Sequence, residues 1–157
     1  MNAIVKQTIL QTTKYAAIAT SIALMSVSTF AADRIKGRVE SGGVAIVGAD
    51  VSLWLTGSSS PKKLAETKTK VDGSYELSLA DVRNDASVLY LIAEGGKAKL
   101  TSGEGANPAT LLMATLGNRP LERVTINELT TVASVWTGQQ FLKGTAMTGD
   151  ALGLRIA

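Results

Sequence analysis

The chain has neither cysteine nor histidine among its 157 residues. Without cysteine it forms no disulfide and offers no thiolate nucleophile. Histidine is the commonest general base near neutral pH and the commonest metal ligand. Its absence excludes Ser-His-Asp and Cys-His catalysis and zinc sites built from cysteine and histidine. We therefore expect a protein that is not an enzyme and that holds no metal and no cofactor.

A serine–lysine pair is the one nucleophile arrangement that these absences leave. Residues 58–60 are serines, and Lys62 and Lys63 follow them. A reactive pair of this kind requires a desolvated lysine with a lowered pKa, whereas glycine, serine and proline together are typical of a loop. Asp81 and Asp85 lack the ligand spacing of a calcium loop. Both segments are interpreted as connections, and a serine–lysine hydrolase is kept as a third hypothesis.

The N-terminus has the pattern of an export signal. Lys6 and Lys14 precede an apolar run over residues 15–30, and the small residues Thr29 and Ala31 suit cleavage after Ala31. The run is diluted by hydroxyl side chains and is short for a membrane span, which needs about 20 apolar residues. We predict a cleaved signal peptide over residues 1–31, a secreted or periplasmic protein, and no stable membrane insertion after cleavage. An uncleaved anchor is the alternative.

The positive charge of the chain arises in part from this segment. The sequence has 16 basic and 13 acidic residues, and the first 31 residues contain two of the lysines and no acid. The remaining part is therefore close to neutral. Nucleic-acid binding normally needs a concentrated basic surface, and the lysines within residues 62–70 are few and mixed with acids. We expect no nucleic-acid partner.

Residues 49–56 alternate between apolar and polar side chains, which is the period of a half-buried strand. One face carries Ala49, Val51, Leu53 and Leu55, and the other carries Asp50, Ser52, Trp54 and Thr56. An aromatic ring among polar neighbours often marks a binding surface. We therefore take Trp54, with Asp50 and Ser52, as candidate residues for carbohydrate binding. The alternative is that Trp54 packs under the loop at residues 58–61 or against a C-terminal helix.

The turn after the next strand is predicted to contain Val71, Asp72 and Gly73. A three-residue loop pairs residue 70 with residue 74 and residue 69 with residue 75, and it places Tyr75, Leu77 and Leu79 on the face of Ala65, Thr67 and Thr69. A two-residue loop would move every side chain to the opposite face, so burial favours the longer loop. Gly73 then occupies the left-handed position that such loops need.

These segments resemble a known family. Residues 37–39 (Gly-Arg-Val), 48–51 (Gly-Ala-Asp-Val) and 69–77 (Thr-Lys-Val-Asp-Gly-Ser-Tyr-Glu-Leu) are similar to the carboxypeptidase regulatory-like domain, over roughly residues 34–96. The resemblance implies a transthyretin-like antiparallel β-sandwich of about seven strands. It also implies a non-catalytic accessory role and supplies no site residues. Hydroxyisourate hydrolases and intradiol dioxygenases, which have related sandwiches, rely on histidine and are excluded.

Two further elements follow. Residues 87–93 form a nearly continuous apolar run, which predicts a central strand covered on both sides. A helix is predicted to begin near Thr125 and Glu128, which have the spacing of a capping box, with Asn127 as a competing cap. An apolar stripe of Leu129, Val132, Ala133 and Trp136 follows at helical spacing. We expect this stripe to pack against another surface, with Trp136 buried.

The patterns divide the chain into a signal peptide (residues 1–31), a β-sandwich (32–96) and a segment with additional strands and a short C-terminal helix (97–157). A helix-like pattern restarts near Gly149 and Asp150, and the sequence stops soon afterwards without a capping or turn signal. We therefore expect that the chain is the N-terminal portion of a longer protein. The first hypothesis is a non-enzymatic exported module with a structural or interaction role, whose partner is a protein or polysaccharide of the cell envelope. The second is a carbohydrate-binding module that uses Trp54.

Cleavage after Ala31 is directly testable. Expression in a cell with an export machinery is expected to yield a protein that begins at Ala32 and has 126 residues, the 31 leader residues having been removed from 157. N-terminal sequencing and intact mass of the exported protein check this. A product that keeps Met1 and sediments with membranes would support the anchor instead.

Overall fold

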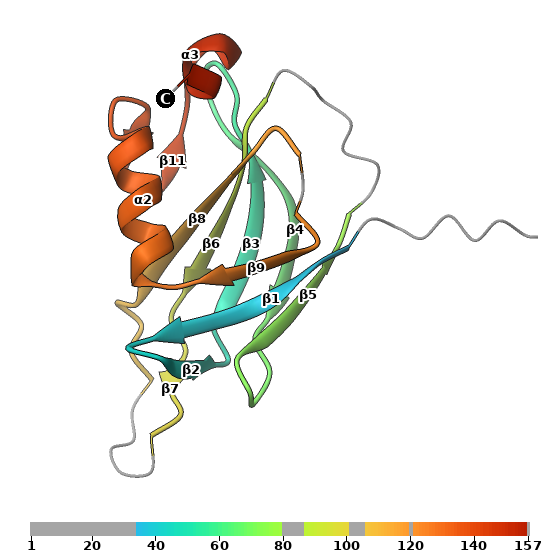
Figure 1. The fold of residues 1–157 in the computed structure, drawn as a ribbon, viewed down its shortest axis with the longest axis vertical. Helices are drawn as coiled ribbons and strands as arrows, with labels where there is room; N and C mark the ends of the chain where they lie inside the picture. Colours follow the sequence, from blue (N-terminus) through green and yellow to red (C-terminus); the bar gives the residue numbers. More distant parts are fainter. Residues whose placement is uncertain (1–33, 80–86, 101–105, 120, 157) are drawn as a thin grey trace, which may run out of the picture. The chain divides into compact units, whose positions relative to one another are not determined.

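The computed structural model describes residues 34–79, 87–100, 106–119 and 121–156. Within these ranges the protein is mainly β, with two larger sheets, a two-stranded ribbon and two helices in its C-terminal part (Figure 1). The predicted mainly-β class with a short C-terminal helix is therefore confirmed. The predicted signal peptide at residues 1–31, as well as Asp81 and Asp85, lies outside the described residues.

Within the described residues, no helix combines the length and the apolar character needed to cross a membrane.

The first sheet is built around β1 (Arg34–Ser41). It pairs antiparallel with β5 (Ser74–Ser78) and β2 (Val44–Val47), and β2 pairs with β7 (Lys97–Ala98). On its other side β1 pairs with β9 (Arg123–Ile126) in parallel, which differs from the antiparallel arrangement predicted. A parallel partner needs a long connection, and here the intervening chain contains all four strands of the second sheet.

The second sheet is antiparallel and has the order β4 (Lys62–Lys68), β3 (Asp50–Leu55), β6 (Leu89–Glu94), β8 (Leu111–Gly117). The apolar face predicted for β3 is confirmed, because Val51 and Leu53 are fully buried. The predicted half-buried character is wrong, because Ser52 on the opposite face is also buried, at 7% exposure. The predicted central strand is β6, which lies between β3 and β8, and all its residues except Glu94 are buried.

Both sheets contribute to one apolar core. The inward-facing side chains of β1, β5 and β9 meet those of β3, β6 and β8, and the largest fully buried members are Ile35, Leu53, Leu77, Leu89, Leu91 and Ile126. Strands β8 and β9 come from the segment after residue 96, which completes the two sheets. The predicted boundary at residue 96 therefore lies within a shared core rather than between two cores.

The turn between β4 and β5 connects the two sheets. Lys70 donates its N–H to the Ser74 carbonyl at 2.8 Å, and Gly73 has a φ of 76°, as the three-residue loop predicts. The predicted hairpin is nevertheless wrong, because β4 pairs with β3 whereas β5 pairs with β1. Thr69 fixes the point at which the chain passes from the second sheet to the first. Its hydroxyl accepts from the Ala49 N–H at 2.9 Å and donates to the Ile46 carbonyl at 2.7 Å.

The faces predicted for these strands are confirmed although the pairing is not. Tyr75, Leu77 and Leu79 are buried, while Glu66 and Lys68 are exposed. Both strands turn their apolar side toward the same core from opposite sheets. The hydrophobic pattern therefore specifies which side of a strand is buried, without specifying its neighbour.

Gly37 lies at a close contact between β1 and β9. It lies opposite Val124, and the Tyr75 hydroxyl donates to the Val124 carbonyl at 2.9 Å beside it. A Cβ on residue 37 would lie 1.7 Å from the Val124 oxygen and 2.8 Å from the Tyr75 oxygen. Only glycine leaves room for this contact.

Gly37→Ala is therefore expected to separate β9 from β1. Overpacking of this kind typically lowers the free energy of unfolding by about 1–3 kcal/mol, which urea titration followed by circular dichroism measures. Ser78→Ala, at an exposed position of β5, is the control and should change stability by less than about 0.5 kcal/mol. Equal stability of the two variants would contradict the tight β1–β9 contact.

Candidate functional site

Helix α2 (Glu128–Gly138) has Asn127 as its N-cap residue, and not the predicted Thr125. The Asn127 side chain accepts from the Thr130 N–H, and the Thr130 hydroxyl accepts from the Asn127 N–H, both at 3.0 Å. Thr125 belongs to β9 and pairs with Arg38. The predicted Thr125–Glu128 capping box is therefore wrong, and the competing cap is the one that forms.

Glu128 instead ties the start of α2 to the turn between β1 and β2. Its carboxylate accepts from the Ser41 hydroxyl at 2.5 Å and from the Gly42 N–H at 2.8 Å. These bonds, with that from Ser41 the largest cause, hold the pKa of Glu128 below its ordinary value. The carboxylate thus stays ionised at neutral pH, and the first turn of the helix is fixed to the first sheet.

Two hydroxyl side chains fix the middle of α2 to the second sheet. The Met113 N–H donates to the Thr131 hydroxyl at 2.9 Å, and the Thr115 N–H donates to the Ser134 hydroxyl at 2.8 Å. Both donors belong to β8, the edge strand of the second sheet. An open edge exposes unpaired backbone groups, and here α2 satisfies two of them as a neighbouring strand would.

The apolar stripe of α2 consequently faces away from the sheet. Leu129, Val132 and Trp136, which we call the outer stripe of α2, are 79%, 66% and 76% exposed, while Ser134 is 3% exposed. The prediction that Trp136 is buried is therefore wrong, and within the described residues the stripe does not pack against another surface. The hydroxyls of Thr131 and Ser134 must face β8, and the stripe lies on the other side of the helix.

Trp54 and Ser52 are brought together on the outer side of β3. The Trp54 ring is half-buried and stacks on Tyr90, with centroids 6.5 Å apart and planes at 15°. Its Nε1–H donates to the Ser52 hydroxyl at 2.8 Å, and the Lys63 ammonium lies 5.3 Å from the ring centroid. The ring and its N–H thus already have partners within the chain.

Asp50, the third predicted binding residue, is paired elsewhere. Its carboxylate forms an ion pair with Lys68 on β4. Carbohydrate binding by Trp54, Asp50 and Ser52 therefore stays a prediction, and the arrangement shows no open aromatic platform joined by free polar groups.

The C-terminal segment covers the same side of the second sheet. It contains β10 (Leu142–Lys143), β11 (Ala146–Met147) and α3 (Ala151–Ile156). Met147 and Leu154 complete a second, smaller core with Val88, Tyr90, Ile92 and Met113, at whose margin Trp54 and Phe141 lie. Burial raises the pKa of Tyr90, and its hydroxyl oxygen accepts from the Met147 N–H at 3.3 Å.

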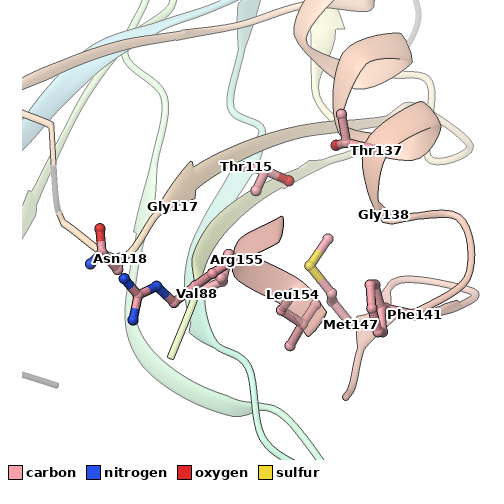
Figure 2. A pocket seen from close by; sticks show the side chains of 10 residues that line it. All are labelled: Val88, Thr115, Gly117, Asn118, Thr137, Gly138, Phe141, Met147, Leu154 and Arg155. Atoms are coloured by element: carbon pink, nitrogen blue, oxygen red, sulfur yellow. The ribbon is translucent and has the colours of Figure 1, made fainter. Parts of the chain in front are cut away.

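A cavity of about 400 Å³ lies where β8, α2 and α3 meet (Figure 2). Its lining consists of Val88, Thr115, Gly117, Asn118, Thr137, Gly138, Phe141, Met147, Leu154 and Arg155. Figure 2 shows Asn118 and Arg155 at one end and Phe141 and Met147 at the other. Among the described residues that line the cavity, Arg155 alone carries a charge, so the cavity offers no carboxylate for acid–base chemistry.

The Thr115 hydroxyl faces this region without a partner. Its oxygen is buried and makes no hydrogen bond to the described residues, although the Thr115 N–H is bound to Ser134. A buried hydroxyl without a partner costs free energy. The lining of the cavity thus includes several apolar side chains, and the unpartnered Thr115 oxygen is buried beside it.

The serine–lysine segment does not form a desolvated pair. Residues 58–60 are exposed, as are Lys62 and Lys63, and the Lys63 ammonium lies 3.3 Å from the Glu66 carboxylate. A serine–lysine dyad requires a desolvated lysine, and neither Lys62 nor Lys63 is desolvated here. In the part of the chain that the structure describes, no group of three or more acids gathers where it could hold a metal ion.

No protein-family model and no curated protein sequence matches the chain. Among solved structures, the chain is similar to a 9R-lipoxygenase from Cyanothece PCC8801, with 12% sequence identity and a TM-score of 0.40. The match covers 60% of this chain and 16% of the lipoxygenase chain. A similarity this low assigns neither a fold family nor an activity to the chain.

Ser134→Ala tests the attachment of α2. The substitution removes the acceptor of the Thr115 N–H, and leaving this partly buried donor unpaired is expected to lower the free energy of unfolding by about 1 kcal/mol. Urea titration measures this loss, and hydrogen exchange should be faster at the Thr115 amide. Thr125→Ala, at an exposed position of β9, is the control, with an expected change below about 0.5 kcal/mol. A larger loss of stability for Thr125→Ala than for Ser134→Ala would contradict this attachment and would support the predicted cap at Thr125.

Proposed function

We propose that the chain is a non-enzymatic, exported interaction module. In this proposal a transthyretin-like β-sandwich presents the outer stripe of α2 to a protein partner outside the cytoplasm. The leader pattern over residues 1–31 supports export, and the resemblance to the carboxypeptidase regulatory-like domain supports an accessory role. The absence of histidine and cysteine from the sequence supports a role without catalysis.

The exposure of the outer stripe is the observation that carries the proposal. A tryptophan, a leucine and a valine lie on one face of a helix and are each at least 66% exposed. Interfaces are enriched in tryptophan, and a few such residues supply most of the binding energy. Burying them against a partner removes apolar surface from water.

The attachment of α2 makes this surface rigid before any partner binds. Glu128 fixes the first turn, and Thr131 and Ser134 fix the middle. A surface that is already ordered loses little conformational entropy on binding. This favours recognition of a matching rigid surface.

A second copy of the chain is the occupant that this stripe fits. From Leu129 to Gly138 the helix carries no charged side chain, so two stripes meet across a two-fold axis without like-charge repulsion. Helices that lie on membranes are rich in lysine and arginine, and α2 has neither. A helix of 11 residues buries less than the ~800 Å² per partner of a standard interface, so we expect a weak dimer.

Sedimentation velocity over a range of protein concentrations tests this. The wild-type protein is expected to shift from monomer to dimer with a Kd on the order of micromolar. The double variant Leu129→Gln/Trp136→Gln should remain monomeric because its stripe no longer excludes water. Both positions are exposed, so its stability should match the wild type within about 1 kcal/mol.

Val71→Gln is the matched control, because Val71 is 68% exposed but belongs to the turn between β4 and β5. It should dimerise like the wild type. A wild-type protein that stays monomeric up to about 1 mM would overturn the second copy as occupant, as would a dimer that the double variant retains.

A further inference from the structure

A groove of about 540 Å³ lies on the outer face of the first sheet, across β5, β1 and β9. Lys36 and Arg38 of β1, Arg123 of β9 and Lys70 of the turn before β5 line it. The two acids in its lining are Glu40 and Glu76. The residues after position 31 are close to neutral as a whole, so the groove is a local concentration of positive charge.

The strand register places cations next to each other in this groove. Lys36 pairs with Glu76 on one side and with Arg123 on the other. Like charges directly opposite on a sheet face are destabilising. Within the described residues, neither Arg123 nor Lys70 forms an ion pair.

The acids of the groove do not balance these cations. Glu76 is shared by Arg34 at 2.7 Å and Lys36 at 3.8 Å, and Glu40 lies 3.5 Å from Arg38. The hydrogen bond from Arg34, followed by the charges of Lys36, Arg34 and Lys70, lowers the pKa of Glu76. The groove therefore keeps a field that attracts anions.

We propose that this groove binds an anionic polysaccharide that carries its charge as carboxylate or sulfate groups. Lys36 and Arg38 point outward from alternate positions of β1, about 6.8 Å apart, and a chain with charges at regular intervals meets several cations at once. The Thr125 hydroxyl also lines the groove and supplies a partner for sugar hydroxyls, and the Ser74 hydroxyl, which donates to the Asp72 carboxylate at 2.6 Å, can still accept.

The same geometry disfavours a peptide. A peptide commonly adds to a strand edge or places apolar side chains in pockets. Residues 36–38 of β1 are already paired with β5 and β9 on both sides, and the groove is lined mostly by charged and hydroxyl side chains. Recognition here rests on side-chain charge and hydrogen bonds.

Isothermal titration of the protein with polygalacturonate, which has one carboxylate per sugar, tests the proposal. The double variant Lys36→Gln/Arg123→Gln should bind about tenfold more weakly, since exposed ion pairs contribute up to ~1 kcal/mol each. Glu76→Gln should bind more tightly, because a competing acid is removed. Added salt should weaken wild-type binding more than binding to the double variant.

Lys97→Gln/Lys99→Gln is the matched control. It removes the same charge at two exposed positions outside the groove lining and should leave the Kd unchanged within about twofold. Lys70→Gln, in the exposed turn, provides a second test if the double variant loses its circular dichroism signal. Sedimentation of all groove variants should match the wild type, which separates this site from the outer stripe of α2.

Four outcomes would overturn the proposal. They are the absence of binding, equal binding to neutral dextran, equal loss in the control variant, and binding of inorganic phosphate alone, which would mean an adventitious ion. Polyglutamate, single-stranded DNA or anionic vesicles that bind more tightly than polygalacturonate, with the same dependence on Lys36 and Arg123, would assign the groove to another class of polyanion.

Discussion

The backbone N–H groups at the edge of β8 are the constraint on which much of the structure depends. Met113 and Thr115 need acceptors there, and the hydroxyls of Thr131 and Ser134 provide them. Because these short polar side chains must face the sheet, the apolar side of α2 faces solvent. The C-terminal end of α2 also forms one wall of the cavity beside Thr115. A demand for hydrogen bonds has thus overridden the usual burial of an apolar helix face.

Strand positions and buried faces were predictable because they are local. The alternation in β3, the apolar run of β6 and the turn at Gly73 each depend on a few neighbouring residues. The pairing of β4 and β5 was not predictable in this way, because Thr69 takes its partners from Ile46 and Ala49, about twenty residues earlier. Whether a turn joins one sheet or connects two is decided by such distant bonds.

The candidate surfaces show the same division. Trp54 was identified from its neighbours on β3, but its stacking on Tyr90 required knowing that β6 lies beside β3. For α2, a signal was present and unused: Thr130, Thr131, Ser134 and Thr137 also recur at helical spacing, opposite the apolar residues. The cationic groove could not be read from the sequence, since Lys36 and Arg123 meet only through the parallel pairing of β1 with β9.

The central position of β1 has a consequence for the order of assembly. Ribosomes make β1 before the other described strands. Its neighbour β9, and Glu128, which lies 87 residues after its partner Ser41, are made only after all four strands of the second sheet. Contacts so far apart in the chain form slowly. The first sheet is therefore completed after the second sheet. Until β9 pairs with it, β1 has an unpaired edge, which a chaperone would need to shield from aggregation.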